Sequence, residues 1–182
     1  MTTWAWPASM VACSVKTGHI NKLAIIEGMK LEPKFINYRQ KIEDSFNRQG
    51  FMKLIGAKLV DVQVGYCEIE VPYRKDLTQQ HGFFHAGVIS TIADNTAGYA
   101  AFSVMEESSS ILTVEFKLNL MSPGDGEKLI GKSKVLKHGR TLTICRSEVY
   151  VEKEGVKKLC AAAQSTLIEL KNTSDKAENN SK

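Results

Sequence analysis

Residues 79–102, QQHGFFHAGVISTIADNTAGYAAF, constrain the fold more than any other segment of the chain. From Ala86 onward the side chains are small or apolar almost all round, and no proline interrupts them. Such a segment predicts a long helix, and a helix that is apolar on nearly every side has to be enclosed by other elements. The rest of the chain therefore has to supply a wall that surrounds it.

The segments before this helix predict one further helix and a hairpin. Residues 34–50 space their aromatic and aliphatic side chains by three or four positions, as in an amphipathic helix, and Gly50 is a natural C-cap. Residues 51–73 contain two β-rich runs separated by Gly65, and apolar and acidic residues alternate in the second run. We therefore expect a helix and two antiparallel strands before residue 79.

Strand-like runs separated by turn signals follow the long helix, at residues 111–123, 127–137, 140–152 and 156–170. The first run alternates strictly, and we expect one face of it to lie in the core, formed by Leu112, Val114, Phe116, Leu118 and Leu120. The runs predict an α+β fold in which a single antiparallel sheet wraps around one long central helix. One helix cannot cover a broad sheet completely, so we also expect dimerisation.

Length and composition suit one domain, since 43% of the 182 residues are hydrophobic. We expect a poorly ordered extension at 1–33, the folded domain at 34–170 and a disordered tail at 171–182. The apolar first residues lack the positive region of a signal peptide, and no stretch reaches the roughly 20 apolar residues of a membrane helix. A cytoplasmic protein without a membrane partner is therefore predicted.

Charge and cysteine spacing argue against several classes of function. The net charge of +4 is small and the basic residues are dispersed, so no nucleic-acid partner is predicted. The four cysteines, Cys13, Cys67, Cys145 and Cys160, are far apart and show no metal-binding spacing. We expect free thiols in a reducing compartment and no metal site.

Asp94 is the only charged residue of the long helix and has no neighbouring cation in the sequence. On a helical wheel its side of the helix carries only small or short residues, namely Gly87, Ser90, Thr91, Ala97, Gly98 and Ala101. The opposite side carries the bulky residues that would anchor the helix to the sheet, namely Val88, Ile89, Ile92 and Tyr99. We interpret the small side as a binding slot with one functional carboxylate. The alternative is a buried carboxylate that only hydrogen-bonds a neighbouring strand.

The start of the helix has no Ser, Thr, Asp or Asn to cap its first N–H groups. Free amides there, of Gly87 above all, could polarise a carbonyl and stabilise an oxyanion. His85 could orient or polarise a substrate, and Gln79 could orient a water molecule. The alternatives are ordinary turn glycines, a structural histidine and surface glutamines.

The segments HGFFHAGVISTIAD and TVEFKLNLMSP resemble the hotdog-fold thioesterases of the phenylacetic-acid-degradation type, and the resemblance covers residues 36–170. That family has a histidine and two glycines at the start of the central helix, and an acidic residue seven positions after the second glycine. These positions are His85, Ala86, Gly87 and Asp94 here, so Ala86 departs from the usual glycine. Gln79 stands where the family commonly has Asn, and Thr113 matches a Ser or Thr contributed across a dimer interface.

The resemblance implies that acyl-CoA is hydrolysed to a free acid and coenzyme A without a cofactor. Asp94 would be the general base or the nucleophile, and the Gly87 amide would polarise the thioester carbonyl. Gln79 and Thr113 would orient the water molecule, with His85 beside them.

The remaining assignments concern substrate binding. Phe83 and Phe84 could line the mouth of the slot, and the slot continues along Gly98, which suits medium or long acyl chains. Gly82 is a further candidate for substrate binding. Lys137 and Arg140 in a strand turn would contact the phosphates of coenzyme A, or would simply form a solvated turn. A homodimer or a dimer of dimers is expected.

Two other functions stay open at this point. Hotdog folds also hydrate or dehydrate acyl thioesters with a histidine and an acid, so an enoyl-CoA hydratase is one alternative. A non-catalytic acyl-CoA-binding protein is the other, and residues 1–50 show no convincing DNA-binding motif that such a sensor would carry.

Overall fold

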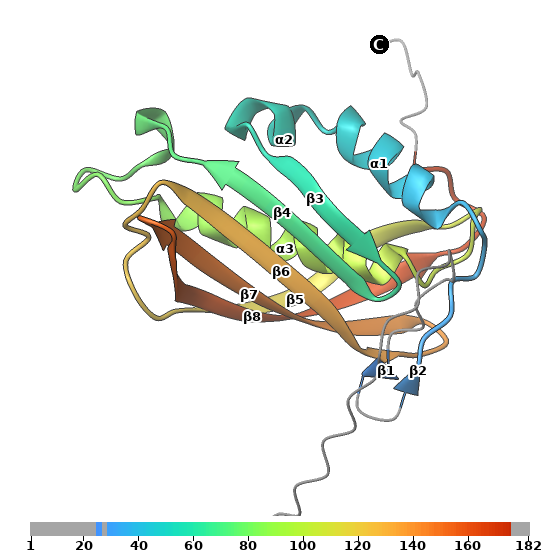
Figure 1. Ribbon diagram of the computed structural model, residues 1–182. Helices are drawn as coiled ribbons and strands as arrows, with labels where there is room; N and C mark the ends of the chain where they lie inside the picture. The colour runs from blue at the N-terminus through green and yellow to red at the C-terminus, as the bar shows by residue number, and fades with distance from the viewer. Residues whose placement is uncertain (1–24, 27–28, 176–182) are drawn as a thin grey trace, which may run out of the picture.

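In the computed structural model, which describes residues 25–26 and 29–175, a six-stranded antiparallel sheet wraps around one long helix, α3 (Figure 1). The strand order of this sheet is β3-β4-β6-β7-β8-β5. The elements are β1 (Ile25–Ile26), β2 (Met29–Lys30), α1 (Tyr38–Arg48), α2 (Gly50–Ile55), β3 (Lys58–Gln63), β4 (Tyr66–Pro72), η1 (Lys75–Leu77), α3 (Ala86–Phe102), β5 (Ser110–Leu120), β6 (Lys128–His138), β7 (Leu142–Lys153) and β8 (Val156–Leu170). The predicted α+β class, with one antiparallel sheet around a central helix, is confirmed.

The predicted ends of the domain are only partly covered by the structure. Residues 1–24, 27–28 and 176–182 lie outside the described residues, so the predicted extension and tail stay predictions there. Among the described residues, Leu31 is buried and lies close to Gly65 in the β3–β4 turn. At the other end, Asp175 forms an ion pair with Arg48 of α1 at 2.6 Å.

The helical segment before the sheet is divided in two, which the sequence pattern did not predict. Gln49 has an extended backbone, α2 begins at Gly50, and Gly56 ends it with a left-handed φ of +70°. The predicted C-cap at Gly50 and the predicted strand start at residue 51 are therefore wrong. The physical reason is the three-residue spacing of Met52 and Ile55, which buries both side chains on one helical face.

Helix α3 lies very close to strand β6 at one point. A Cβ on Gly131 would overlap the Cγ2 atom of Ile92, so the strand backbone fits against the helix only because glycine stands there. Beside this contact, the Ser133 hydroxyl donates to Thr96 Oγ1 at 2.7 Å, and the Ser147 hydroxyl donates to the Ala93 carbonyl oxygen at 2.8 Å. These buried contacts set which side of α3 faces the sheet.

Strand β5 is at the edge of the sheet and contains a β-bulge between Thr113 and Glu115. Thr113 lies opposite Leu167 of β8 and Phe116 lies opposite Ser165, and both of these β8 residues are buried. Opposite residues of an antiparallel pair share a face, so the bulge puts Thr113 and Phe116 on the same inner face although they are three positions apart.

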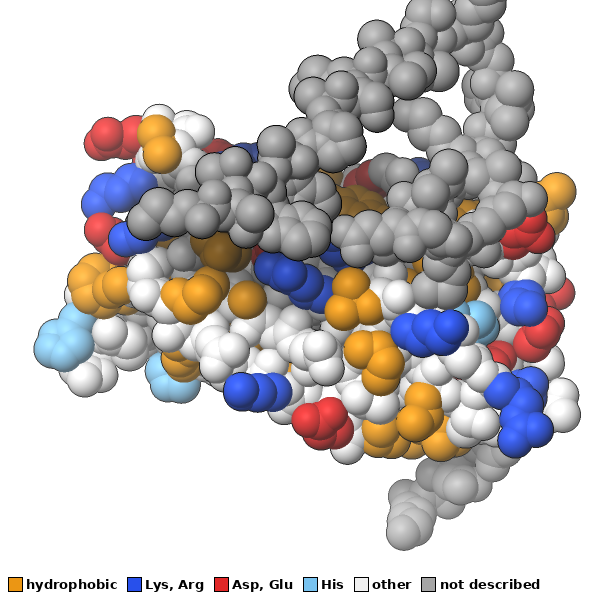
Figure 2. All heavy atoms as spheres, turned by 90° about the horizontal axis from the view of Figure 1, so that it is seen from below, with side chains coloured by type: hydrophobic (Ala, Val, Ile, Leu, Met, Phe, Trp, Pro, Cys, Tyr) orange, Lys and Arg blue, Asp and Glu red, His pale blue; other side chains and the backbone are white. Residues whose placement is uncertain are grey.

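The predicted core face of β5 is therefore wrong before the bulge, where Thr113 and not Leu112 is on the inner face, whereas Phe116, Leu118 and Leu120 lie on the inner face as predicted. Leu112 lies opposite Ile168 on the other face of the sheet, and Leu112 and Val114 are 57% and 54% exposed. On the inner face, Phe116 and Leu120 are still 42% and 54% exposed. Figure 2 shows further hydrophobic side chains at the surface, scattered between charged ones on the face seen from below. A period-two pattern cannot reveal the bulge, because one extra residue reverses the alternation.

We predict that Gly131→Ala lowers the free energy of unfolding by about 1–3 kcal/mol, because the added methyl group overpacks the contact with Ile92. Chemical denaturation followed by circular dichroism measures the change. Gly50→Ala is the control, since a Cβ at Gly50 meets no atom within 4 Å. Equal unfolding midpoints for the two variants would contradict the close packing described here.

Candidate active site

Helix α3 has one open side, which faces away from the packed contact with β6. The exposed or partly exposed residues of α3 are Ala86, Gly87, Ser90, Thr91, Asp94, Asn95 and Gly98. The predicted small-residue side is thus largely open, except that Ala97 and Ala101 are fully buried. Because a helical turn takes 3.6 residues, the side that packs through Ile92 and Thr96 leaves Asp94 on the open side.

The Asp94 carboxylate is partly buried, and its recorded hydrogen bond comes from a single side chain. Thr113 Oγ1 of β5 donates to Asp94 Oδ1 at 2.8 Å. Burial raises the pKa of the Asp94 carboxyl above its ordinary value, and the hydrogen bond from Thr113 partly opposes that increase. The ion pairs among the described residues do not include Asp94. A half-buried carboxylate without a cation is poised to accept a proton or to attack an electrophile.

Thr113 reaches Asp94 within one chain, whereas the resemblance implied that this residue crosses a dimer interface. The β-bulge after Thr113 turns its side chain toward α3. The sequence analysis did not predict this contact between the two candidate residues, and the contact needs no second copy.

A cavity of about 920 Å³ opens beside Asp94, between α3, the start of β5 and the junction of α1 and α2. Asp94, Gly98 and Thr113 line it, and the sequence analysis had placed Asp94 and Gly98 on one side of the helix. The sequence analysis did not single out Asn95 and Gln49, which also line the cavity. Asn95 could have been found from its position next to Asp94, whereas nothing in the local sequence links Gln49 to this helix.

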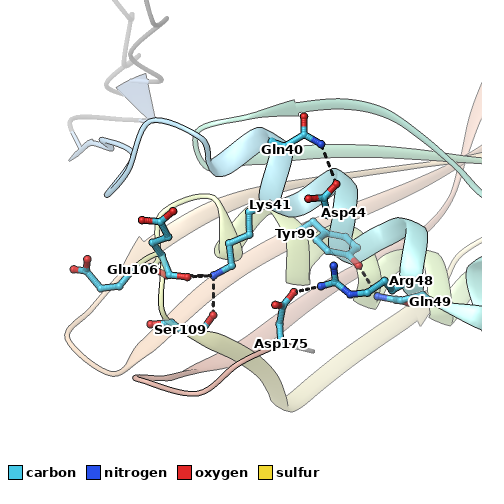
Figure 3. Close-up of polar contacts among 10 residues, drawn as sticks. Gln40, Lys41, Asp44, Arg48, Gln49, Tyr99, Glu106, Ser109 and Asp175 are labelled. Atoms are coloured by element: carbon cyan, nitrogen blue, oxygen red, sulfur yellow. Dashed lines mark hydrogen bonds and ion pairs between the residues drawn. The ribbon is translucent and has the colours of Figure 1, made fainter. Parts of the chain in front are cut away.

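Tyr99 was expected to anchor α3 to the sheet, but it packs against α1 instead. Its ring meets Phe46 edge-on, with centroids 5.9 Å apart, and its hydroxyl accepts a hydrogen bond from Gln49 Nε2 at 2.6 Å (Figure 3). The residue is 4% exposed and also lines the cavity. The α1–α2 junction thus supplies a polar wall that the sequence pattern did not predict.

The start of α3 carries a cap that the sequence analysis missed. His85 is the N-cap residue, and its Nδ1 accepts a hydrogen bond from the Gly87 N–H at 2.9 Å. The expectation that no side chain caps this helix is therefore wrong, because an imidazole nitrogen replaces the usual hydroxyl or carboxylate. The Ala86 N–H has no hydrogen-bond acceptor recorded among the described residues.

The loop before α3 holds its predicted site residues away from the cavity. The Gln79 side-chain oxygen accepts a hydrogen bond from the His81 N–H, and Gly82 closes the same turn with a φ of +83°. Phe84 is 3% exposed and packs edge-on against Tyr73, so the prediction that it lines the mouth of a slot is wrong. Its backbone bonds to Gly124, which draws the ring into the core.

Lys137 and Arg140 lie at the β6–β7 turn and are exposed. Neither lines the cavity beside Asp94. The structure therefore separates the predicted site residues into three places: the cavity, the α3 start with its preceding loop, and this turn.

The described residues contain no group of three or more His, Cys, Asp or Glu side chains that could hold a metal ion. Cys67, Cys145 and Cys160 are buried free thiols, and burial raises the pKa of each. Cys13 lies outside the described residues. None of the described helices is long and apolar enough to cross a membrane.

Known proteins resemble this chain in both sequence and structure. The family model of the thioesterase superfamily matches residues 81–158. The crystal structure of a thioesterase family protein from Silicibacter pomeroyi is 45% identical, with a TM-score of 0.72, over 73% of this chain and 98% of that one.

Two more distant structures show the same fold. A thioesterase from Haemophilus influenzae is 18% identical with a TM-score of 0.68, over 79% of this chain and 97% of that one. The E. coli PaaI protein from the phenylacetic acid degradation operon is 16% identical with a TM-score of 0.66, over 75% of this chain and 96% of that one. At these identities the likeness concerns the fold alone.

We predict that the pKa of Asp94 rises further in Thr113→Val, because that variant removes the hydrogen bond that stabilises the charged carboxylate. A carbon-detected NMR titration of the Asp94 carboxyl measures the two midpoints. Thr166→Val is the control, since the Thr166 hydroxyl donates to Glu115 instead. Identical Asp94 midpoints in the wild type and in Thr113→Val would contradict the assigned contact.

Proposed function

The chain belongs to the thioesterase superfamily and is a thioester hydrolase, and from this premise we propose that it hydrolyses acyl-CoA to a free acid and coenzyme A. The observation that carries the proposal is the half-buried Asp94 carboxylate, which lies beside a cavity and has no cation partner among the described residues. Thioester hydrolysis needs a basic or nucleophilic group next to a site for the carbonyl, and neither a metal nor a redox cofactor is required.

Asp94 either removes a proton from a water molecule or attacks the thioester carbonyl itself. In the first case the water oxygen adds to the carbonyl carbon and Asp94 takes its proton. The carbon–sulfur bond then breaks, and the thiolate of coenzyme A leaves and is protonated. The raised pKa of Asp94 supports the first role, because a stronger base accepts a proton more readily. Thr113, which already donates to Asp94, orients the carboxylate.

The thioester oxygen is assigned to the N–H groups at the start of α3. The Gly87 N–H is bonded to His85 in the structure, while the Ala86 N–H has no recorded acceptor. We therefore extend the predicted oxyanion site from Gly87 to both amides. The exposed imidazole of His85 accepts the hydrogen bond from the Gly87 N–H until a substrate oxygen replaces it as the acceptor. Gln79 is kept as a candidate for orienting water, although its side chain accepts from His81 here.

The spacing along α3 favours a site shared by two copies of the chain. Asp94 follows Gly87 by seven residues, which is about 10 Å along the helix axis, so both groups of one helix are poorly placed to contact the same carbonyl. The helix start of one copy and the Asp94 cavity of another would solve this problem. The unpaired edge of β5, with its exposed apolar side chains, supports such an assembly, because long apolar edges are normally covered.

The preference for medium or long acyl chains stays a prediction. The cavity volume of about 920 Å³ is large enough for such groups, but part of the wall is polar. Lys137 and Arg140 remain candidates for binding the phosphates of coenzyme A, since both are exposed and cationic. A cytoplasmic location is proposed with the same substrate, since coenzyme A thioesters are made and used there.

We predict that the purified protein releases thiol from acyl-CoA substrates and that Asp94→Asn lowers kcat by at least about 100-fold. A chromogenic thiol assay over a panel of acyl chain lengths measures both results. Asp125→Asn is the control, because Asp125 is a surface carboxylate paired with Lys153.

The Asp94→Asn variant also has a predicted effect on folding stability. Burial raises the folded pKa of Asp94, so its charge opposes folding at neutral pH, and this opposition fades as the pH falls through the folded pKa. The Asp94→Asn variant should therefore be at least as stable as the wild type at pH 7.

Full activity in the Asp94→Asn variant would remove Asp94 from the mechanism. Hydration of enoyl-CoA without thiol release would favour the hydratase, and binding without turnover would favour the acyl-CoA-binding protein.

We predict that Val114→Asp converts a dimer into monomers and lowers activity, because it puts a charge on the exposed apolar edge strand β5. Light scattering coupled to size-exclusion chromatography measures the mass. Val156→Asp is the control, since Val156 is 70% exposed at the β7–β8 turn, away from this edge. A monomeric wild-type protein with full activity would contradict the shared site.

A further inference from the structure

The cavity beside Asp94 has walls of two different kinds. On one side lie apolar groups, including Phe102 of α3, Ile111 of β5 and Leu167 of β8. On the other side, the α1–α2 junction contributes polar groups, including Gln49. An unbranched alkyl chain bound at Asp94 would therefore have an apolar wall on one side and this polar wall on the other.

The polar wall is organised around Tyr99 and Gln49, which Figure 3 shows pointing toward each other from α3 and from the α1–α2 junction. The edge contact with Phe46 holds the tyrosine ring in place. Burial raises the pKa of Tyr99, and hydrogen bonds with Ser45 and Gln49 partly oppose that increase, so the phenol stays neutral. The Gln49 amide uses Nε2 to reach the phenol, and no hydrogen bond to its Oε1 is recorded among the described residues.

Arg48, a cation at the α1–α2 junction, already has an ion-pair partner. Arg48 forms an ion pair with Asp175 at 2.6 Å, as the dashed line in Figure 3 marks. A carboxylate at the end of a substrate would have to displace Asp175 to pair with Arg48, and the other cation that lines the cavity, Lys53, is exposed to solvent, where an ion pair contributes little. A neutral hydroxyl group needs no such exchange, because it can donate to Gln49 Oε1.

The position of Tyr99 along α3 sets the length of the acyl group that can contact it. Tyr99 follows Asp94 by five residues, which is about 7.5 Å along the helix axis. An extended chain advances about 1.2 Å per bond, because three backbone bonds span about 3.6 Å, so an acyl group of about six or seven carbons covers this distance from a carbonyl beside Asp94. A shorter group would not reach it, and a longer one would have to bend or pass it.

This inference rests on the proposed function. We propose that the Gln49–Tyr99 pair is a specificity determinant, and that it selects acyl-CoA substrates of about six carbons that carry a hydroxyl group at the far end. A polar pair left facing a methyl group loses its hydrogen-bonding opportunity, whereas a hydroxyl group satisfies it, so the pair discriminates against plain alkyl chains.

The test compares kcat/KM for hexanoyl-CoA and 6-hydroxyhexanoyl-CoA, which differ by one hydroxyl group. The wild type should prefer the hydroxylated substrate by at least about tenfold. Gln49→Met, which has a similar volume but no amide, should bring the two values to within about twofold, mainly through KM. Tyr99→Phe should reduce the preference in the same direction.

Gln40→Leu is the matched control, because Gln40 lies on α1 and bonds to Asp44 outside this cavity (Figure 3). It should keep the wild-type preference, and circular dichroism confirms that each variant is folded. Equal wild-type values for the two substrates, or a preference that survives in Gln49→Met, would overturn this inference alone. Failure to release thiol from either substrate and from the whole acyl-CoA panel would overturn the proposed function with it.

Discussion

The contact between α3 and β6 governs the arrangement of the rest of the molecule. Gly131 lets the strand backbone approach Ile92, and the hydroxyl groups of Ser133 and Thr96 join the two elements within the same buried region. A helix held this tightly cannot rotate about its axis, because any rotation would drive a side chain into the strand or leave a hydroxyl unpaired. The open side of the helix, with Asp94 on it, follows from that constraint.

The carboxylate on the open side takes part in none of the ion pairs among the described residues. Its burial disfavours the charged form, and the hydrogen bond from Thr113 offsets only part of this effect. Two local irregularities make the arrangement possible. The bulge in β5 turns Thr113 inward, and the break at Gln49 between α1 and α2 brings a polar group to the same cavity. Irregular backbone next to a reactive group is a common way to aim side chains.

Features that depend on neighbouring residues in the sequence were predicted well. The apolar character of residues 86–102 indicated α3 and its enclosure, and the isolated carboxylate in it indicated Asp94 as the candidate group. Features that depend on one extra residue or on an unusual partner were missed. The bulge reversed the expected faces of β5 in the part of the strand before Val114. The His85 imidazole capped a helix whose sequence lacks the usual capping residues, and Phe84 is buried with a backbone bond to Gly124.

The amino-acid sequence alone determined that one enclosed helix is wrapped by an antiparallel sheet, and that a single acidic side chain interrupts that helix. Hydrophobic periodicity carries this information, since it acts over a few residues and does not depend on distant partners. Only the tertiary structure decided that Thr113, Gln49 and Tyr99 meet around the cavity beside Asp94. These residues lie up to 64 positions apart, and their meeting depends on strand register and helix packing, which periodicity does not encode.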